Sequence, residues 1–352
     1  MSSYLVTGGA GFIGAQVAEL LLAQGHTVHA VDNLSEFYSP ILKQWRLEQL
    51  GRFPAFAFHY GDIEYGDRFL ELARSFGPLD GVIHLAARAG VRPSVQSPLA
   101  YFQTNLLGTM NVLEVCRQLE IPKVVVASSS SVYGEHNAMP YREDSDSNRP
   151  LSPYAASKKA AEELCFTYHH LYRLDISLPR FFTVYGPAGR PDMSMFRFIQ
   201  AIVEGEPLTL LGDGQQVRDF SYVGDIARGV VAALRPTRYR IFNLGANHPV
   251  TLNHVIETIE KASGRQAIIL RQAADPTDVP ATWADVSRAR EELDWSPAIG
   301  LEEGVATALQ WYLANREWAR GMNDFSPASN DLGSIGRIPA SEAAIPISPL
   351  AA

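Results

Sequence analysis

The stretch PYAASK, residues 153–158, places a tyrosine and a lysine four positions apart. On a helix, positions i and i+4 share one face with Cβ atoms about 5–6 Å apart, so Tyr154 and Lys158 would lie side by side. A phenol with a pKa of about 10 is protonated at neutral pH, and a neighbouring ammonium group favours the phenolate. The pair therefore indicates a general base acting on a substrate hydroxyl, although two such residues alone are more often an ordinary surface pair.

Four consecutive serines, residues 128–131, follow the apolar run KVVVA. Ligands of open parallel sheets bind at the carboxyl ends of the strands, so one of these hydroxyls could bridge a substrate oxygen and Tyr154. A serine hydrolase is disfavoured because the G-x-S-x-G pattern is missing and no histidine is placed to act as its base. His84, inside the apolar stretch VIHLAA, is interpreted as a hydrogen-bonded core histidine.

The turn GGAGFIG carries glycines at 8, 11 and 14 between a strand-like and a helix-like run. Gly8 permits a tight turn, Gly11 lets the backbone approach a pyrophosphate, and Gly14 lets the helix pack against the sheet; the helix N-terminus favours the negative charge. Asp32 follows about 20 residues later, where an acid binds the adenosine ribose and repels a 2′-phosphate. With the serines and the Tyr–Lys pair, this turn predicts an NAD-dependent enzyme. Asp62 could reach the adenine amine or be a simple turn residue.

The runs that must position these residues alternate between strand-like and helix-like through the first half of the chain. Strands separated by helices require crossover connections, which predicts an α/β fold with a doubly wound parallel sheet of the Rossmann type. Beyond residue 180 the pattern loosens, as in a smaller mixed α/β substrate domain. We therefore expect an NAD-binding domain at 1–179, a partly interleaved substrate domain at 180–320, and a mostly disordered tail at 321–352, which is rich in Pro, Ser, Ala and Gly.

The composition is that of an ordinary globular protein, with 46% hydrophobic and 19% charged residues. The net charge of −8 argues against a nucleic-acid surface, for which a basic stripe is expected. Cys116 and Cys165 lack the paired spacing of a disulfide framework or a zinc site, so no metal and a reducing compartment are expected. No signal peptide precedes the first strand pattern, and no apolar run approaches the roughly 18 residues of a spanning helix. We expect a cytoplasmic protein with no membrane partner.

Taken together, these motifs resemble those of the extended short-chain dehydrogenase/reductases, in particular the NAD-dependent nucleotide-sugar epimerase/dehydratase family. The resemblance extends from residue 3 to residue 318. It implies NAD as the cofactor, a UDP-sugar substrate, and a homodimer formed through helices that include the one bearing Tyr154. The motifs that carry it are GxxGxxG at 8–14, DN at 32–33, GDI at 61–63, HLAA at 84–87, SSSSVYG at 128–134, YxxxK at 154–158, RFFTVYGP at 180–187 and RDF at 218–220.

The resemblance also implies roles for single residues. Tyr154 is the expected base, and Lys158 is its partner, which also holds the nicotinamide ribose. The catalytic hydroxyl is expected at Ser129, with Ser128 as the next candidate. The residues expected to bind the cofactor are Gly8, Gly11, Phe12, Ile13, Gly14, Asp32, Asn33, Asp62, Ile63, Leu85, Ala86, Ala87, Tyr154 and Lys158.

Three stretches, DNLSEFYSPILKQWRLEQL, ARAGVRPSVQSP and FFTVYGPAGRPDM, are similar to those of UDP-glucuronate 4-epimerases within this family. The similarity implies that Arg190 holds the hexuronate carboxylate, and that Thr183 replaces an asparagine of galactose-type epimerases. It further implies that Arg218 grips the diphosphate and that Asp278 meets the uridine ribose. Ala188 departs from the pattern, because a bulkier or basic residue is common there.

The implied reaction is NAD-dependent epimerisation at C4 of a UDP-hexuronate, from UDP-glucuronate to UDP-galacturonate, through a transient 4-keto intermediate. Related dehydratases need an Asp-Glu pair directly after the catalytic hydroxyl, and UDP-glucuronate decarboxylases carry a glutamate in the same stretch. Ser130 and Ser131 stand there instead, so loss of water or CO2 is not expected. The alternatives are a UDP-glucose/UDP-galactose 4-epimerase, then the decarboxylase, and a non-catalytic NAD-binding sensor, which would commonly lack the Tyr–Lys pair.

Overall fold

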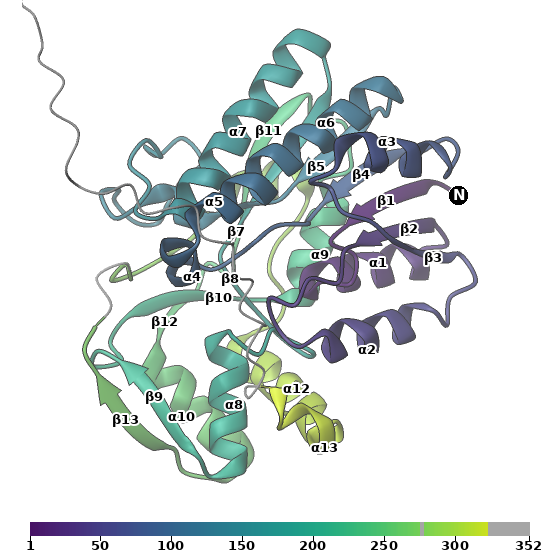
Figure 1. Cartoon of the computed structure of the whole chain (residues 1–352). Coiled ribbons are helices and arrows are strands. Elements are labelled where there is room, and N and C mark those ends of the chain that lie inside the picture. The colour runs from purple at the N-terminus through teal and green to yellow at the C-terminus, as the bar shows by residue number, and fades with distance from the viewer. Residues whose placement is uncertain (275–277, 323–352) are drawn as a thin grey trace, which may run out of the picture.

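The computed structural model describes residues 1–274 and 278–322, which are built around a parallel β-sheet with helices on both faces (Figure 1). Within these residues the sheet has eight strands in the order β11-β7-β5-β4-β1-β2-β3, with β6 beside β7. All its strand pairs are parallel, which confirms the predicted doubly wound α/β fold. The strands are β1 (Ser3–Thr7), β2 (Thr27–Asp32), β3 (Phe56–Tyr60), β4 (Gly81–His84), β5 (Lys123–Val126), β6 (Ser128–Ser129), β7 (Asp175–Phe181) and β11 (Tyr239–Leu244).

Helices cover both faces of this sheet, as crossover connections between parallel strands require. In Figure 1, α1 and α9 lie on one side of the sheet, and α3, α6 and α7 lie on the other. The helices around the sheet are α1 (Phe12–Ala23), α2 (Pro40–Leu50), α3 (Gly66–Arg74), α6 (Gly108–Gln118), α7 (Pro153–Tyr172), α9 (Val223–Ala232) and α11 (Ser287–Leu293). Shorter pieces are α4 (Val91–Gln96), α5 (Pro98–Phe102), the π-helical turn Gln103–Leu107 and the 3₁₀ turn Ser130–Tyr133.

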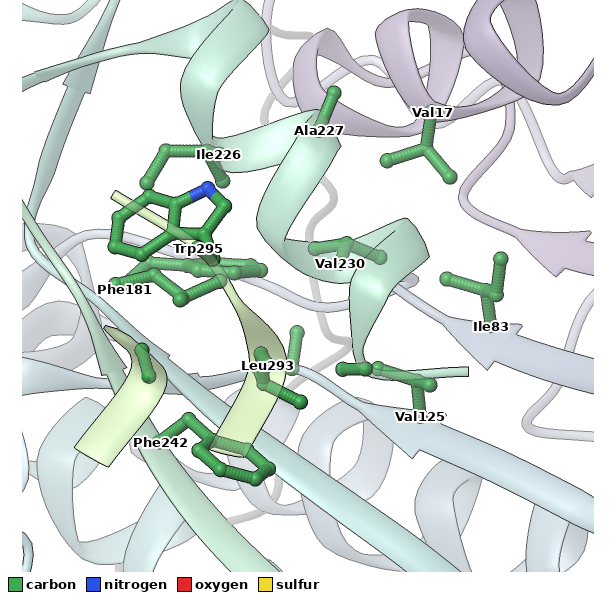
Figure 2. Close-up of a cluster of buried hydrophobic side chains, with 14 of the residues drawn as sticks. Val17, Ile83, Val125, Phe181, Ile226, Ala227, Val230, Phe242, Leu293 and Trp295 are labelled. Carbon is green, nitrogen blue, oxygen red and sulfur yellow. The ribbon is translucent and has the colours of Figure 1, made fainter. Parts of the chain in front are cut away.

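Side chains of the central strands alternate between two cores, as the period of a β-strand dictates. On β4 and β5, Ile83 and Val125 belong to one core, and Val82 and Val124 belong to the other; all four are fully buried. Figure 2 shows the first core, in which Trp295 lies beside α9. Because both faces of these strands pack in apolar cores, polar side chains can reach a ligand only beyond the carboxyl ends of the strands.

A second, smaller unit has its own core and is built from later segments. The chain passes between the units more than once, because α9 and β11 return to the large sheet after the small one has begun. The boundary expected at residue 180 falls inside β7. The division into units at 1–179 and 180–320, partly interleaved, therefore stays a proposal. Within the described residues, the small unit contains the sheet β12-β10-β8 and the strand pair β13-β9, built from β8 (Thr183–Tyr185), β9 (Pro207–Leu211), β10 (Val217–Tyr222), β12 (Pro249–Thr251) and β13 (Ile268–Gln272). Its helices there are α8 (Ser194–Glu204), α10 (Leu252–Ser263), α12 (Leu301–Ala314) and α13 (Arg316–Ala319).

The tail expected at 321–352 lies outside the described residues, except for Gly321 and Met322. Met322 is 3% exposed and packs in the second core, so this residue of the expected tail belongs to the folded small unit. None of the helices in the described ranges is long and apolar enough to cross a membrane.

His84 ends β4 in the middle of the fold, and both of its ring nitrogens have hydroxyl partners. Nδ1 lies 2.7 Å from Oγ1 of Thr7, and Nε2 lies 3.0 Å from Oγ1 of Thr109. The Thr109 hydroxyl donates to the carbonyl oxygen of Asn105, so it accepts from Nε2–H of a neutral ring. Burial lowers the pKa of His84 to about 3, and the charge of Lys158 acts in the same direction. The interpretation of His84 as a core histidine is confirmed.

The His84 pKa predicts a loss of stability in mild acid. An unfolded histidine titrates at 6.5 and the folded one at about 3, so at pH 7 both states are neutral and His84 has no effect. Below pH 6.5 only the unfolded state takes up the proton, and the free energy of unfolding should fall by about 2 kcal/mol between pH 7 and pH 5. His84→Gln should remove this part of the fall, measured by urea unfolding at both pH values. An equal change in His248→Gln, at an exposed position, would contradict the assignment.

Candidate active site

A cavity of about 470 Å³ opens at the carboxyl ends of the central strands. Its position follows from the strand order, which reverses at β1, between β2 and β4. Its wall contains every residue that the sequence assigned to the site, from Gly8 in the first turn to Asp278 in the small unit. The roles of these residues stay predictions, but the fold brings the residues themselves together.

The glycine turn forms a backbone cradle at one end of the cavity. Gly8 has a φ of 71°, and a Cβ on it would lie 2.7 Å from the backbone nitrogen of Ala86. A Cβ on Gly14 would lie 2.1 Å from the carbonyl oxygen of Gly8. The first turn of α1 has no side-chain cap, so its N–H groups remain available to an anion. This cradle fits the pyrophosphate of a dinucleotide.

The residues expected at the adenosine end are held by side-chain contacts. Asp32 Oδ1 accepts from the backbone N–H of Leu34 at 2.8 Å and from Lys43 Nζ at 3.1 Å. Asp62 Oδ2 accepts from Asn33 Nδ2 at 3.0 Å. Lys43 is buried and was missed by sequence reasoning, since a lysine in a helix after β2 carries no signal of its own. It offsets part of the Asp32 charge and fixes the carboxylate on the cavity wall.

The four serines after β5 are not equivalent. Ser128 Oγ donates to Glu162 Oε1 at 2.6 Å, whereas Ser129 forms a hydrogen bond with Tyr154. Glu162 is 2% exposed and forms a two-point ion pair with Arg180, at 2.8 and 2.7 Å. Ser128 is therefore committed to a buried charge pair, and Ser129 is the hydroxyl that faces the tyrosine. Sequence reasoning missed Glu162 and Arg180, although a glutamate four residues after Lys158 on a buried helix face was a possible signal.

Helix α7 places Tyr154 and Lys158 on the cavity. Its N-cap is Ser152, whose side-chain oxygen accepts a hydrogen bond from the N–H of Ala155 at 3.1 Å, and its first residue is a proline. Lys158 Nζ donates to the carbonyl oxygen of Ala127 at 3.0 Å, and burial lowers the pKa of Lys158 to about 8. The hydrogen bond from Lys158 thus holds α7, with the proposed catalytic groups, against the carboxyl end of β5.

The pKa of Tyr154 is raised in the protein alone, whereas the lowered pKa expected from the sequence concerns a tyrosine with both Lys158 and the positive nicotinamide ring beside it. Burial raises it, while the hydrogen bond with Ser129 and the charge of Arg190 act in the opposite direction. In the protein alone the tyrosine is therefore a phenol at neutral pH, and further positive charge is needed to make it a base.

Arg190 reaches the cavity from the small unit. Its Nε and Nη2 bind the two carboxylate oxygens of Asp192 at 3.0 and 2.6 Å. Its guanidinium packs against the rings of Phe37 and Tyr38, at 5.4 and 5.8 Å from their centroids. Its charge acts on Tyr154, so the residue predicted to bind the substrate carboxylate lies within electrostatic reach of the proposed base.

At the far end of the cavity, the residues expected to bind the nucleotide are paired with each other. Arg218 Nη2 donates to Asp278 Oδ1 at 2.7 Å, and Arg92 Nη2 donates to Oδ2 of the same carboxylate at 3.3 Å. Thr183 lines the cavity from β8. A diphosphate approaching Arg218 would therefore compete with the Asp278 carboxylate.

Asn105 is another residue that sequence reasoning missed. It is fully buried in the π-helical turn before α6, a distortion that is frequent at functional sites. Its Nδ2 donates to the Arg88 carbonyl oxygen and to Ser157 Oγ, both at 2.9 Å. Its Oδ1 accepts from the Arg88 N–H at 2.8 Å. Asn105 thereby ties the segment after β4 to α7.

The chain matches known proteins over most of its length. A model of the NAD dependent epimerase/dehydratase family matches residues 4–245. The chain is 48% identical to a UDP-glucuronate 4-epimerase from Thermodesulfobacterium geofontis over 318 residues, covering 90% of this chain and 98% of the relative.

Solved structures show the same similarity. A UDP-glucuronic acid 4-epimerase from Bacillus cereus, in complex with UDP-glucuronic acid and NAD, superposes with a TM-score of 0.84 at 35% identity, covering 89% of this chain and 99% of that one. A UDP-glucose 4-epimerase from Thermotoga maritima with UDP-glucose gives a TM-score of 0.82 at 30% identity, covering 89% and 99%. Both kinds of sugar thus occur among structures similar to this chain.

The glycine turn yields a direct test of the dinucleotide site. Gly14→Ala should lower the NAD content of the purified protein and reduce Tm by roughly 5 °C or more, because the new methyl group would collide with the Gly8 carbonyl oxygen. The control is Gly321→Ala, where a Cβ meets nothing within 4 Å. Bound NAD is measured by absorbance after heat release, and Tm by scanning calorimetry. Wild-type NAD content in Gly14→Ala would show that the turn does not bind the cofactor.

Proposed function

Since this chain belongs to the NAD dependent epimerase/dehydratase family, we propose that it interconverts UDP-glucuronate and UDP-galacturonate by epimerisation at C4. The observation that carries the proposal is one cavity in which the Ser129–Tyr154 pair meets Arg190, a guanidinium suited to a sugar carboxylate. NAD is the cofactor, and the cradle of Gly8 and Gly14 fits its pyrophosphate.

The chain's own residues supply the proton chemistry. Tyr154 takes the proton of the C4 hydroxyl and later returns it to the oxygen of the inverted centre. NAD, held by the glycine turn and by Lys158, would supply the acceptor and donor of the C4 hydride, so the sugar would pass through a 4-keto stage. Ser129 holds the substrate oxygen beside Tyr154, and its hydrogen bond lowers the pKa of the phenol. Lys158 would hold the nicotinamide ribose and add positive charge there.

Arg190 has a second proposed role at the 4-keto stage. A ketone at C4 and a carboxylate on C5 make a β-keto acid, which loses CO2 when the C5–carboxylate bond aligns with the carbonyl π-system. A guanidinium anchored by packing on Phe37 and Tyr38 can hold the carboxylate near the plane of the ketone, where this alignment is poor. The arginine then protects the intermediate as well as binding it.

Two sister reactions are disfavoured by the groups around Ser129. Ser130 and Ser131 line the cavity at the positions where dehydratases and decarboxylases need carboxylates. Neither hydroxyl can transfer a proton as a carboxylate does at neutral pH. Elimination of water or CO2 is therefore not supported by this cavity wall.

A neutral UDP-hexose is the second candidate substrate, and one contact favours it. Arg190 is already paired at two points with Asp192, so a substrate carboxylate must displace or share this partner, whereas an uncharged C5 substituent need not. Competition between UDP-glucuronate and UDP-glucose separates the two. A higher kcat/KM for UDP-glucose would select the neutral sugar.

The test of the proposed function is incubation of the purified chain with UDP-glucuronate, without added NAD, followed by proton NMR of the sugar. UDP-galacturonate should form with no net NADH, since the cofactor is regenerated in every cycle. No conversion even with NAD added would contradict the proposal and would direct the search to UDP-glucose and then to a non-catalytic NAD-binding sensor. A UDP-pentose as the main product would instead indicate a decarboxylase.

The two neighbouring serines should respond differently to substitution. Ser129→Ala should lower kcat by about 10² to 10³ with stability unchanged, because it removes a hydroxyl from the reacting oxygen. Ser128→Ala should keep kcat but lower the free energy of unfolding by about 1–3 kcal/mol, because the buried Glu162 loses a donor. Turnover and urea unfolding of both variants give the comparison. The reverse pattern would make Ser128 the catalytic hydroxyl.

The protective role of Arg190 predicts a change in product ratio. Arg190→Ala should raise the share of UDP-pentose relative to the epimer, because the C5–carboxylate bond is no longer restrained. The products are separated by anion-exchange chromatography after a single turnover with saturating substrate. An unchanged ratio with only a higher KM would leave Arg190 a binding role alone.

We also propose a homodimer that forms through α6 and α7. The outward faces of these helices expose large apolar side chains, among them Met110, Phe166 and Leu171, which a second copy would cover. Sedimentation equilibrium should give twice the chain mass for the wild type, and Leu171→Lys should shift the protein toward the monomer. A monomeric wild type would rule the dimer out.

The cytoplasm is the proposed location of the protein. Cys116 and Cys165 are both fully buried free thiols, as a reducing compartment allows. Fractionation of producing cells, with the chain followed by antibody, should recover it with cytoplasmic enzymes. Recovery with the membranes would contradict this location.

A further inference from the structure

A buried arginine on α2 has no carboxylate partner within the described ranges. Arg46 is 3% exposed and does not line the cavity. Its Nη1 donates to the carbonyl oxygen of Ala10 at 3.1 Å and to Tyr38 Oη at 2.8 Å, and its Nη2 donates to the carbonyl oxygen of Ala188 at 2.6 Å. A buried cation without a counter-charge is costly. Stability alone is therefore a poor reason for an arginine at this position.

The three acceptors of Arg46 come from segments far apart in the sequence. Ala10 belongs to the glycine turn at the cofactor end of the cavity, and Tyr38 belongs to the loop between β2 and α2. Ala188 belongs to the loop that carries Arg190. Its φ of 51° is in the left-handed region, which is unfavourable for alanine. The hydrogen bond from Arg46 to its carbonyl oxygen supports this conformation two residues before Arg190.

Tyr38 provides a second link between the two arginines. It is 8% exposed, and its hydroxyl accepts from Arg46. Its ring centroid lies 5.7 Å from the Arg46 guanidinium carbon and 5.8 Å from that of Arg190. A cation over an aromatic ring is attracted to it, so the ring acts as a spacer between two positive groups. Arg190 is thus held through the loop backbone and through Tyr38, and both contacts involve Arg46.

We propose that Arg46 is a positioning residue that sets the place from which Arg190 meets the sugar carboxylate. This inference rests on the proposed function, in which Arg190 anchors a hexuronate. Arg46 does not line the cavity itself, so its effect on the substrate passes through the residues it contacts. Ala188 and Tyr38 connect it to Arg190, whereas Ala10 and the ring of Phe12 connect it to the glycine turn, a route that saturating NAD takes out of the test. With NAD saturating, loss of Arg46 should therefore reproduce part of the loss of Arg190 and nothing beyond it.

The test is a double-mutant cycle on the full chain, with Arg46→Met and Arg190→Ala, UDP-glucuronate as substrate and saturating NAD in every assay. Arg46→Met should raise KM about tenfold and raise the share of UDP-pentose in the product. The double variant should match Arg190→Ala alone, because one residue acts through the other. Arg52→Met, at an exposed arginine just after α2, is the matched control and should behave as the wild type.

Two readouts separate positioning from a general loss of structure. Fewer active molecules would lower kcat and leave KM and the product ratio unchanged, and that result would overturn the proposal, as would additive effects in the double variant. Binding of UDP, which lacks the carboxylate, should be the same in Arg46→Met and wild type by calorimetry. A loss of UDP binding similar to the loss for UDP-glucuronate would also overturn it.

A second variant keeps the test decisive if Arg46→Met does not fold. Tyr38→Leu removes the ring between the two arginines and leaves the backbone acceptors of Arg46 in place. It should raise KM and be non-additive with Arg190→Ala, and additivity would overturn the proposal. The wild type distinguishes a failure of the proposed function from a failure of the Arg46 proposal. If the wild type does not convert UDP-glucuronate, the proposed function is wrong. If it does, but the effects of the variants are additive, only the role of Arg46 is wrong.

Discussion

The close approach of two backbone segments in the turn between β1 and α1 is the constraint on which the site depends. A Cβ at position 14 would lie 2.1 Å from the carbonyl oxygen of Gly8, so α1 can begin directly over the strand end only because glycine is there. This fixes the N-terminus of α1 where the strand order reverses. The cavity opens at that place, and later segments bearing Thr183 and Arg190 close it from the other side.

Buried charges decide which polar groups around the cavity can react. The Glu162–Arg180 pair engages Ser128 and leaves Ser129 to Tyr154. Tyr154 comes from the large unit and Arg190 from the small one, yet the charge of Arg190 acts on the pKa of Tyr154. The proposed base and the proposed carboxylate anchor are therefore electrostatically coupled across the two units, which joins substrate recognition to proton transfer.

Several parts of this arrangement could be predicted because they depend on local spacing. The glycines of the first turn, Asp32 at the end of the next strand, and the Tyr–Lys pair on one helix face all follow from periods of a few residues. The contacts of Lys43, Asn105 and Glu162 could not be predicted in the same way, because each joins segments that only the fold brings together.

The sequence by itself determined the fold class, the cofactor turn and the shared helix face of Tyr154 and Lys158, since strand and helix periods act over short distances along the chain. Tertiary structure alone decided that Ser129 rather than Ser128 faces the tyrosine and that Arg190 is paired with Asp192. It also decided that burial raises the pKa of Tyr154 in the protein alone. Burial and charge at a given atom depend on neighbours that are distant in sequence, and only the folded chain sets them.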